Sequence, residues 1–224
     1  VMANSMIDNP PAPEDADLVK SFSKIGLVPG ESFDMENLDP KLAMAIEKGF
    51  KSGHQKIVDN IPTMGTIQNG WMILSGGGNY GTDYLFRASI AVFGLGYNVD
   101  EDANYPLGFQ DNNGDVLNGE NKYVLHFPEG QLPPVNAFWS VTMYENSYFY
   151  ANSIDRYAIG DRDELEFNED DSLDIYIQHE SPEGKESNWL PAPEGDFDLV
   201  IRLYWPQEEF FEGTWQMPPV MKVE

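Results

Sequence analysis

The sequence contains no cysteine, which excludes disulfide bonds, thiolate nucleophiles and cysteine-ligated zinc sites. Basic residues are also scarce: 13 Lys and Arg stand against 38 Asp and Glu, so the formal net charge is −25. Such a charge repels phosphate backbones and anionic lipid surfaces, and we therefore expect no binding to nucleic acid. The longest apolar run, residues 88–95, is far shorter than the roughly 18 residues of a membrane span, so we expect no membrane insertion.

Histidine is rare as well, and its spacing does not indicate a metal site. The three histidines are His54, His126 and His179, and none forms an H-x-x-x-H pair. His126 and His179 could meet across a sheet, but a metal site would still need a carboxylate such as Glu180. The G-x-S-x-G motif of serine hydrolases is also absent. We predict no metal and no cofactor.

What the sequence does contain changes character near residue 106. Before it, helical spacing and capping signals predict helices over about residues 14–24, from Asp39-Pro40 to about residue 57, and over residues 82–95. After it, apolar and polar residues alternate over residues 123–127, 137–143, 173–178 and 199–205, which is typical of half-buried antiparallel strands. The second part also carries −18 of the net charge. We predict an α+β protein, with a mainly helical segment (residues 1–105) followed by an antiparallel, jelly-roll-like β-sandwich (residues 106–224).

One stretch matches a cofactor motif. Residues 76–81 fit G-x-G-x-x-G after the short apolar run 71–74, and Asp100, Glu101 and Asp102 lie about twenty residues on, where a ribose-binding carboxylate would sit. However, no second βα unit follows. A glycine-rich connector that permits close packing of a helix is the favoured interpretation over a dinucleotide site.

Two acidic stretches each allow either a metal-binding or a purely structural interpretation. Residues 111–115 imitate a calcium loop, but Val116 stands where that loop needs glycine, so a hairpin tip is favoured. The second stretch is an acidic cluster around a turn, which we interpret as a solvated edge rather than a divalent-cation site; its members are Asp161, Asp163, Glu164, Asp170, Asp171 and Asp174.

Polar and aromatic residues that share strand faces are the best candidates for a ligand site. They are His126, Ser140, Tyr144, Tyr176, Arg202 and Tyr204. Arg202 interrupts an otherwise apolar strand and is expected to need a carboxylate or carbonyl partner, in a structural ion pair or in a pocket. Asp83 and Arg87, four residues apart in a helix, allow the same two interpretations.

Several strings resemble a family of bacterial proteins that join domain of unknown function 1254 to domain of unknown function 1214. They include residues 80–88 (YGTDYLFRA), 122–128 (KYVLHFP), 132–144 (LPPVNAFWSVTMY), 155–160 (DRYAIG), 173–180 (LDIYIQHE), 188–193 (NWLPAP) and 202–206 (RLYWP). The resemblance implies that the chain holds the second domain, which is jelly-roll-like, and the helical connector before it. It further implies a homo-oligomer that is periplasmic or secreted. Since the chain opens with Val1, we expect an upstream segment to be missing.

The sequence leaves two classes of function open. The first is a non-catalytic module that binds a neutral small molecule or carbohydrate, or builds an oligomeric scaffold, through aromatic and polar sheet faces. The second is a hydrolase of glycosides or esters, in which carboxylates or His126 and His179 would be the acid–base groups.

Overall fold

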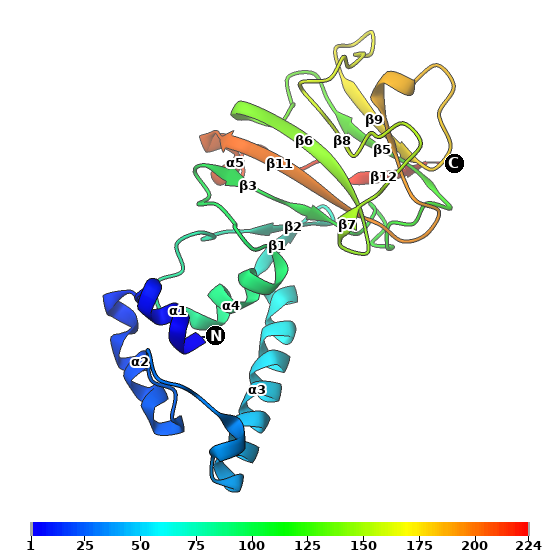
Figure 1. The fold of residues 1–224 in the computed structure, drawn as a ribbon. Coiled ribbons are helices and arrows are strands. Elements are labelled where there is room, and N and C mark those ends of the chain that lie inside the picture. The colour runs from blue at the N-terminus through cyan, green and yellow to red at the C-terminus, as the bar shows by residue number, and fades with distance from the viewer. Residues whose placement is uncertain (1, 224) are drawn as a thin grey trace. The chain divides into compact units, whose positions relative to one another are not determined.

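The computed structural model describes residues 2–223, which fall into two compact units (Figure 1). The first unit extends to Met64 and includes Asn79–Gly96. The second unit comprises Gly65–Gly78 and the chain from Tyr97 onward. The fold mixes 29% helix with 27% strand, which confirms an α+β class.

The first unit is helical. Its elements are α1 (Met2–Asp8), η1 (Pro13–Asp15), α2 (Ala16–Ser21), η2 (Phe22–Ile25), η3 (Met35–Asn37), α3 (Pro40–Asn60), η4 (Ile61–Thr63) and α4 (Tyr84–Phe93). The long helix α3 begins where expected, because the Asp39 carboxylate accepts hydrogen bonds from the amides of Lys41 and Leu42, and Pro40 occupies the first helical position. The helix predicted over residues 14–24 is divided into the three short elements η1, α2 and η2, and it ends at Gly26, which has a φ of 80°.

Strands make up most of the second unit. They are β1 (Gly65–Gln68), β2 (Trp71–Leu74), β3 (Ala103–Asn104), β4 (Leu107–Gly108), β5 (Lys122–Phe127), β6 (Val135–Glu145), β7 (Tyr148–Phe149), β8 (Ala158–Gly160), β9 (Leu173–Gln178), β10 (Trp189–Pro191), β11 (Asp198–Pro206) and β12 (Val220–Val223). The short helices η5 (Glu186–Asn188) and α5 (Glu208–Phe211) complete it.

Within residues 2–223 these strands form two sheets. The larger sheet has the order β1-β2-β4-β11-β6-β7, with β3 also paired to β11 and β8 to β6. The smaller sheet has the order β10-β9-β5-β12. Pairing is antiparallel except between β9 and β10, which run parallel. The sheet structure is curled and mainly antiparallel and forms a half-barrel, and the jelly-roll sandwich predicted from the sequence is not confirmed.

The core lies between the inward faces of the two sheets, where the predicted alternation places apolar side chains. These side chains are almost completely buried. They include Tyr123, Leu125, Phe127, Trp139, Val141, Met143, Leu173, Ile175, Ile177, Leu199, Ile201 and Leu203. Trp205 is the exception, because the alternation assigns it to this face although its side chain is 63% exposed. The register shifts between Tyr204 and Pro206, and Trp205 has a φ of 54°, so the bulge breaks the alternation.

Residues 76–78 of the glycine-rich stretch lie in the second unit, and residues 79–81 belong to the first. A Cβ atom on Gly77 would lie 2.2 Å from the Tyr97 ring, and one on Gly78 would lie 2.7 Å from the Val99 amide nitrogen. The close neighbour is therefore the segment at residues 97–99, rather than the helix that the sequence suggested. Asp100 accepts hydrogen bonds from the Ser75 hydroxyl (3.0 Å) and the Gly76 amide (2.7 Å). The Asp100 carboxylate, one of three at the position where a ribose ligand would sit in a dinucleotide site, holds the connector in place.

The outer strands of the smaller sheet have individual features. The edge strand β10 is three residues long and ends in Pro191, which lacks an amide hydrogen. At the other edge, the Asn112 amide donates to the Val220 carbonyl of β12, and the Asn112 side-chain oxygen accepts from the Lys222 amide, both at 2.9 Å. Asn112 belongs to the predicted turn at residues 111–115, in which Asp111 accepts from the amides of Asn113 and Asp115.

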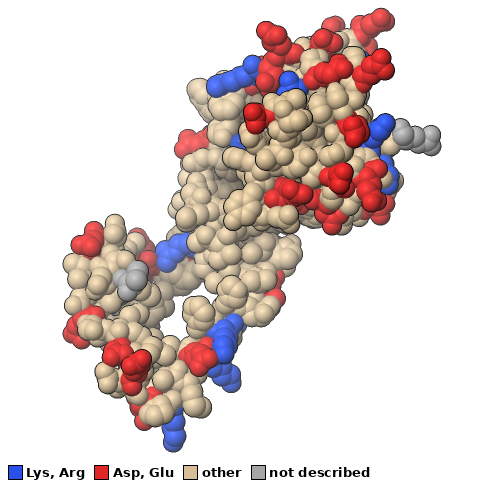
Figure 2. All heavy atoms as spheres, turned by 45° about the vertical axis from the view of Figure 1, so that its right-hand side comes forward, with Lys and Arg blue, Asp and Glu red and all other residues tan. Residues whose placement is uncertain are grey.

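On the face of the second unit that Figure 2 shows, the charged patches are mostly Asp and Glu, with few Lys and Arg among them. Among the described residues, no helix has the length and apolar character needed to cross a membrane.

Candidate functional site

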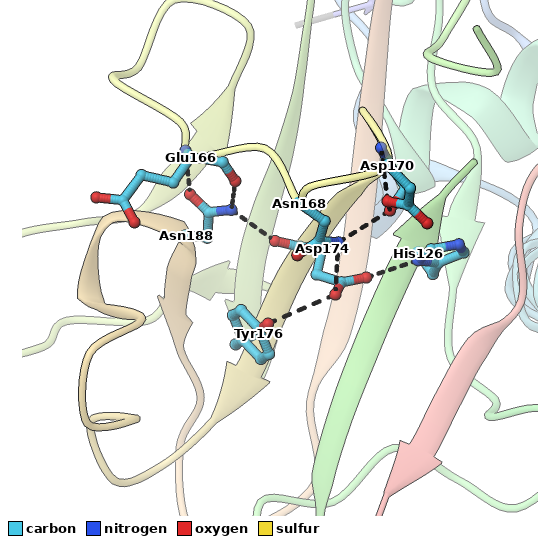
Figure 3. A network of polar contacts seen from close by, with 8 residues as sticks. His126, Glu166, Asn168, Asp170, Asp174, Tyr176 and Asn188 are labelled. Atoms are coloured by element: carbon cyan, nitrogen blue, oxygen red, sulfur yellow. Dashed lines mark hydrogen bonds and ion pairs between the residues drawn. The ribbon is translucent and has the colours of Figure 1, made fainter. Parts of the chain in front are cut away.

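His126 and Asp174 form a cross-strand pair on the outer face of the smaller sheet. They occupy paired positions on β5 and β9, next to Leu125 and Ile175, which point into the core. Nδ1 of His126 lies 2.7 Å from Oδ1 of Asp174 (Figure 3). The alternation of a strand therefore places both polar side chains outward while their neighbours anchor them.

The Asp174 carboxylate is the centre of a larger network (Figure 3). Its Oδ2 atom accepts from the Asn168 amide group at 3.0 Å and lies 3.5 Å from the Tyr176 hydroxyl. The Asn188 side chain donates to the backbone carbonyls of Asp174 and Glu166, and accepts from the Glu166 amide. These bonds tie the loop before β9 to η5, and so fix the position of the Asp174 carboxylate.

The acidic turn before β9 is ordered by the same network. The Ser172 hydroxyl donates to Asp170 at 2.6 Å, and the Ser172 amide donates to the same oxygen at 3.2 Å. These two donors hold the pKa of the Asp170 carboxyl below its usual value of 3.8, with the hydroxyl as the larger cause. The solvated edge expected from the sequence is thus partly a hydrogen-bonded support for β9.

A groove of about 670 Å³ opens beside His126. Its lining is Asn69, His126, Pro128, Gln131, Thr214, Gln216, Met217, Pro218, Pro219 and Met221. Among these described residues there is no Asp, Glu, Lys or Arg. A groove lined by none of these residues is notable in a chain with 38 Asp and Glu and a net charge of −25.

Hydrogen bonds from distant parts of the second unit hold the walls of this groove. The Trp71 indole donates to the Pro218 carbonyl at 2.9 Å, and the Asn69 side chain donates to the Met217 carbonyl at 2.7 Å. On the other side, the Trp215 indole donates to the Gln131 carbonyl at 2.9 Å. Because Trp71 and Trp215 are buried, the groove rests on the core.

The geometry gives His126 a defined chemical role. A carboxylate next to Nδ1 favours the tautomer that carries its proton there, which leaves Nε2 as an acceptor. Within residues 2–223, Nε2 of His126 has no hydrogen-bond partner. The site can therefore accept a proton or a hydrogen bond from a molecule in the groove.

The structure distributes the residues predicted for a ligand site over three places. His126 and Tyr176 lie in the network just described, whereas Ser140, Tyr144, Arg202 and Tyr204 lie on β6 and β11 of the larger sheet. Asp83 and Arg87 lie in the first unit.

The Arg202 cluster differs from the expectation in the chemistry of its partners. Its guanidinium donates to the hydroxyl of Thr142 and, at 2.7 Å, to that of Tyr144, where a carboxylate or carbonyl was expected. Ser140 is the direct cross-strand partner of Arg202, and the Tyr204 ring stacks on Phe138 with centroids 4.2 Å apart. Because Arg202 is only partly buried, hydroxyl oxygens are sufficient hydrogen-bond acceptors for its guanidinium group.

Asp83 and Arg87 do not form the ion pair that their spacing suggested. Asp83 is the N-cap of α4 and accepts from the Phe86 amide at 3.0 Å. Instead, Nη1 of Arg87 lies 3.4 Å from Oδ2 of Asp15, a residue that is far away in the sequence. Capping took precedence over side-chain pairing because Asp83 stands directly before the first helical residue.

A metal centre finds no support in the described part of the chain, where no cluster of three His, Asp or Glu side chains could hold an ion. The Nδ1 atom of His179 lies 2.9 Å from the Ala192 carbonyl oxygen, and Nε2 lies 3.8 Å from Glu194. Among the described residues, His179 therefore shares no hydrogen-bond partner with His126.

Sequence reasoning missed two parts of the site. Asp174 was grouped with the acidic turn, although its position in the alternation of β9 places it on the face opposite Ile175. The groove residues were missed because they come from separate segments, namely Asn69, Gln131 and the stretch 214–219. The clustering of Pro, Gln and Met over residues 214–221 was the available signal.

Comparison with known proteins adds a family for part of the chain. The model of a family described as Protein of unknown function (DUF1214) matches residues 102–208. The crystal structure of the VPA0106 protein from Vibrio parahaemolyticus is 25% identical, with a TM-score of 0.66, over 94% of this chain and 51% of that one. An uncharacterised protein from Burkholderia cenocepacia is 13% identical, with a TM-score of 0.40, over 99% of this chain and 52% of that one. No curated protein matches.

The chain therefore spans about half the length of these two proteins. The matched region begins just before β3 and ends at the start of α5, so it contains both members of the His126–Asp174 pair. Residues 102–208 are similar to the DUF1214 proteins, whose function is unknown.

Proposed function

We propose that the second unit binds a neutral, polar small molecule, such as a carbohydrate, in the groove beside His126. The observation that carries this proposal is the uncharged lining of the groove in a strongly acidic chain. A charged ligand would be left without a counter-charge there, whereas a neutral one is accommodated without the cost of burying an unpaired charge.

The groove also offers suitable hydrogen-bonding groups. The side chains of Gln131 and Gln216 can donate and accept, and Nε2 of His126 accepts. The Thr214 hydroxyl donates to the Glu209 carbonyl at 3.3 Å and can still accept. Pro218 and Met221 add apolar surface, and the volume lies within the usual range of about 300–1,000 Å³ for small-molecule sites.

The test uses neutral monosaccharides and their charged analogues as probes. Glucose and galactose are titrated by calorimetry alongside glucuronate and glucosamine, and we expect only the neutral sugars to bind. Gln216→Ala should weaken binding at least about fivefold, since a lost hydrogen bond to a neutral group is worth about 1 kcal/mol. Gln55→Ala, which changes an exposed glutamine of α3, is the matched control and should have no effect. Equal binding by Gln216→Ala, or a preference for a charged sugar, contradicts the proposal.

A second candidate function, hydrolysis of glycosides or esters, is favoured by the orientation of His126 by Asp174. In that case Nε2 would take a proton from an attacking water. Turnover of nitrophenyl esters or glycosides should then disappear in His126→Gln and persist in His179→Gln. Turnover that survives His126→Gln rejects this candidate.

The sequence resemblance supports further proposals about the whole protein. The two sheets would close in a jelly-roll-like sandwich, an upstream domain of unknown function 1254 would precede this chain, and the protein would form a periplasmic or secreted homo-oligomer. Light scattering of the purified full-length protein and fractionation of its host cell test the last proposal, and a cytosolic monomer would reject it.

A further inference from the structure

A second cavity of about 460 Å³ lies at the end of β11, apart from the groove beside His126. Its apolar part contains Trp205 and Phe211, and its charged part contains Glu101, Glu208 and Glu209. Among the described residues that line it there is no Lys, Arg or His. Two exposed aromatic rings and three carboxylates thus share one cavity.

The position of Trp205 in this cavity is imposed by the backbone. Trp205 has a φ of 54°, which is unfavourable for a bulky residue, and the bulge turns its side chain out of the core. Its amide donates to the Asp102 carbonyl at 2.8 Å, which fixes this arrangement. The other four tryptophans of the chain, all among the described residues, are at most 7% exposed, whereas Trp205 is 63% exposed. The fold holds this indole in solvent at a conformational cost.

The combination indicates a class of ligand. The face of an indole attracts a cation, and alkylammonium groups bind such faces well because their positive charge is diffuse and weakly hydrated. The nearby carboxylates add Coulombic attraction. We propose that this cavity binds a small organic cation of the alkylammonium type, with Trp205 and Phe211 against its methyl groups and the three glutamates as counter-charge.

Other classes of ligand fit the cavity less well. Anions are repelled by the three carboxylates, and an inorganic cation would leave the exposed rings unused. Two amide side chains, Asn136 and Gln207, also line the cavity, and the Gln207 nitrogen donates to the Asn136 side-chain oxygen at 3.1 Å and to the Val135 carbonyl at 3.3 Å. This nitrogen and the Asn136 oxygen are therefore less available to a neutral sugar.

The experiment compares choline with its neutral carbon analogue, in which carbon replaces the quaternary nitrogen. Because Trp205 is the exposed tryptophan, quenching of intrinsic fluorescence by neutral acrylamide reports mainly on this cavity. At constant ionic strength, choline should reduce quenching in a saturable manner, and the neutral analogue should not. Calorimetry with both compounds gives the affinities.

Two sets of variants complete the test. Trp205→Leu should weaken choline binding about three- to tenfold, and Trp205→Phe should weaken it less. Because Trp205→Leu could disturb the bulge, a second variant, Glu208→Gln with Glu209→Gln, keeps all shapes and removes two charges. It should also weaken binding, whereas the matched pair Glu120→Gln with Glu164→Gln, at exposed positions outside the cavity lining, should not. Equal binding of choline and its neutral analogue, no binding of choline, or an equal effect of both glutamate pairs overturns the proposal.

Discussion

His126 and Asp174 face each other across β5 and β9, and Nδ1 of the imidazole lies 2.7 Å from the carboxylate. Directly beside them, Leu125 and Ile175 are paired on the opposite face of the same strands and are fully buried. A polar pair built on strands with a packed inner face is held more precisely than one built on loops.

The first prediction concerns the tautomer of His126. Asp174→Ala removes the acceptor beside Nδ1, so the neutral ring should shift from the Nδ1–H form toward the Nε2–H form. Nitrogen-15 chemical shifts of the ring measure this change. His179, whose Nδ1 lies 2.9 Å from the Ala192 carbonyl oxygen, serves as an internal control and should not change. Identical His126 shifts in both proteins would show that Asp174 does not set the tautomer.

The second prediction concerns two glycines joined by a backbone hydrogen bond, Gly119 and Gly195. A Cβ atom on Gly119 would lie 1.6 Å from the Pro193 carbonyl oxygen, so Gly119→Ala must displace backbone. We expect a loss of about 1–3 kcal/mol, or more, in the free energy of unfolding. A Cβ atom on Gly195 would have no neighbour within 4 Å among the described residues, so Gly195→Ala should change the free energy of unfolding by less than about 0.5 kcal/mol. Urea denaturation measures both, and equal losses would contradict the geometry.

The third prediction concerns acid stability. The Ser172 hydroxyl lowers the pKa of folded Asp170, so the ionised form favours the folded state. This stabilisation is complete above the unfolded pKa of about 3.9 and is lost as the pH falls through the lower folded pKa. Ser172→Ala should raise the pKa of Asp170 toward 3.8 and flatten the decline of stability below about pH 4.

Carbon-13 titration of the Asp170 carboxyl and denaturation at several pH values test this expectation. Because Ser172 is buried, Asp170→Asn and the double variant are measured as well, so that the coupling is separated from packing. A pKa of Asp170 that is unchanged in Ser172→Ala would reject the stated cause.

The fourth prediction concerns the start of α3. Asp39→Ala removes the acceptor of the Lys41 and Leu42 amides and should destabilise the first unit by about 1 kcal/mol. Asp39→Ser keeps a capping oxygen and should restore most of that loss. Circular dichroism during thermal unfolding measures both variants, and equal melting of Asp39→Ala and the unaltered protein would exclude the cap as a source of stability.

The sequence predicts well those features that depend on neighbours along the chain. The alternation around Leu125, Ile175 and Ile201 locates strands and their buried faces, and Asp39-Pro40 locates a helix start. Two features were not predicted: the end of the α-helix at Ser21 and the bulge at Trp205. Both depend on local backbone geometry that the pattern of residue types does not encode.

The candidate site was less predictable because it depends on strand register and on distant segments. The sequence singled out His126, but its partner Asp174 follows from the pairing of β5 with β9, which alternation alone does not specify. Arg202 was expected to need a carboxylate or carbonyl partner, yet its guanidinium donates to the hydroxyls of Thr142 and Tyr144, which the cross-strand neighbour β6 supplies.

The two outer strands of the smaller sheet bear on how copies of this protein can meet. Pro191 removes a donor from β10, and Asn112 occupies a carbonyl and an amide of β12, so both margins resist the addition of a foreign strand. Self-association of this unit should therefore proceed through side-chain surfaces or the larger sheet, and the smaller sheet should be a poor template for fibril growth.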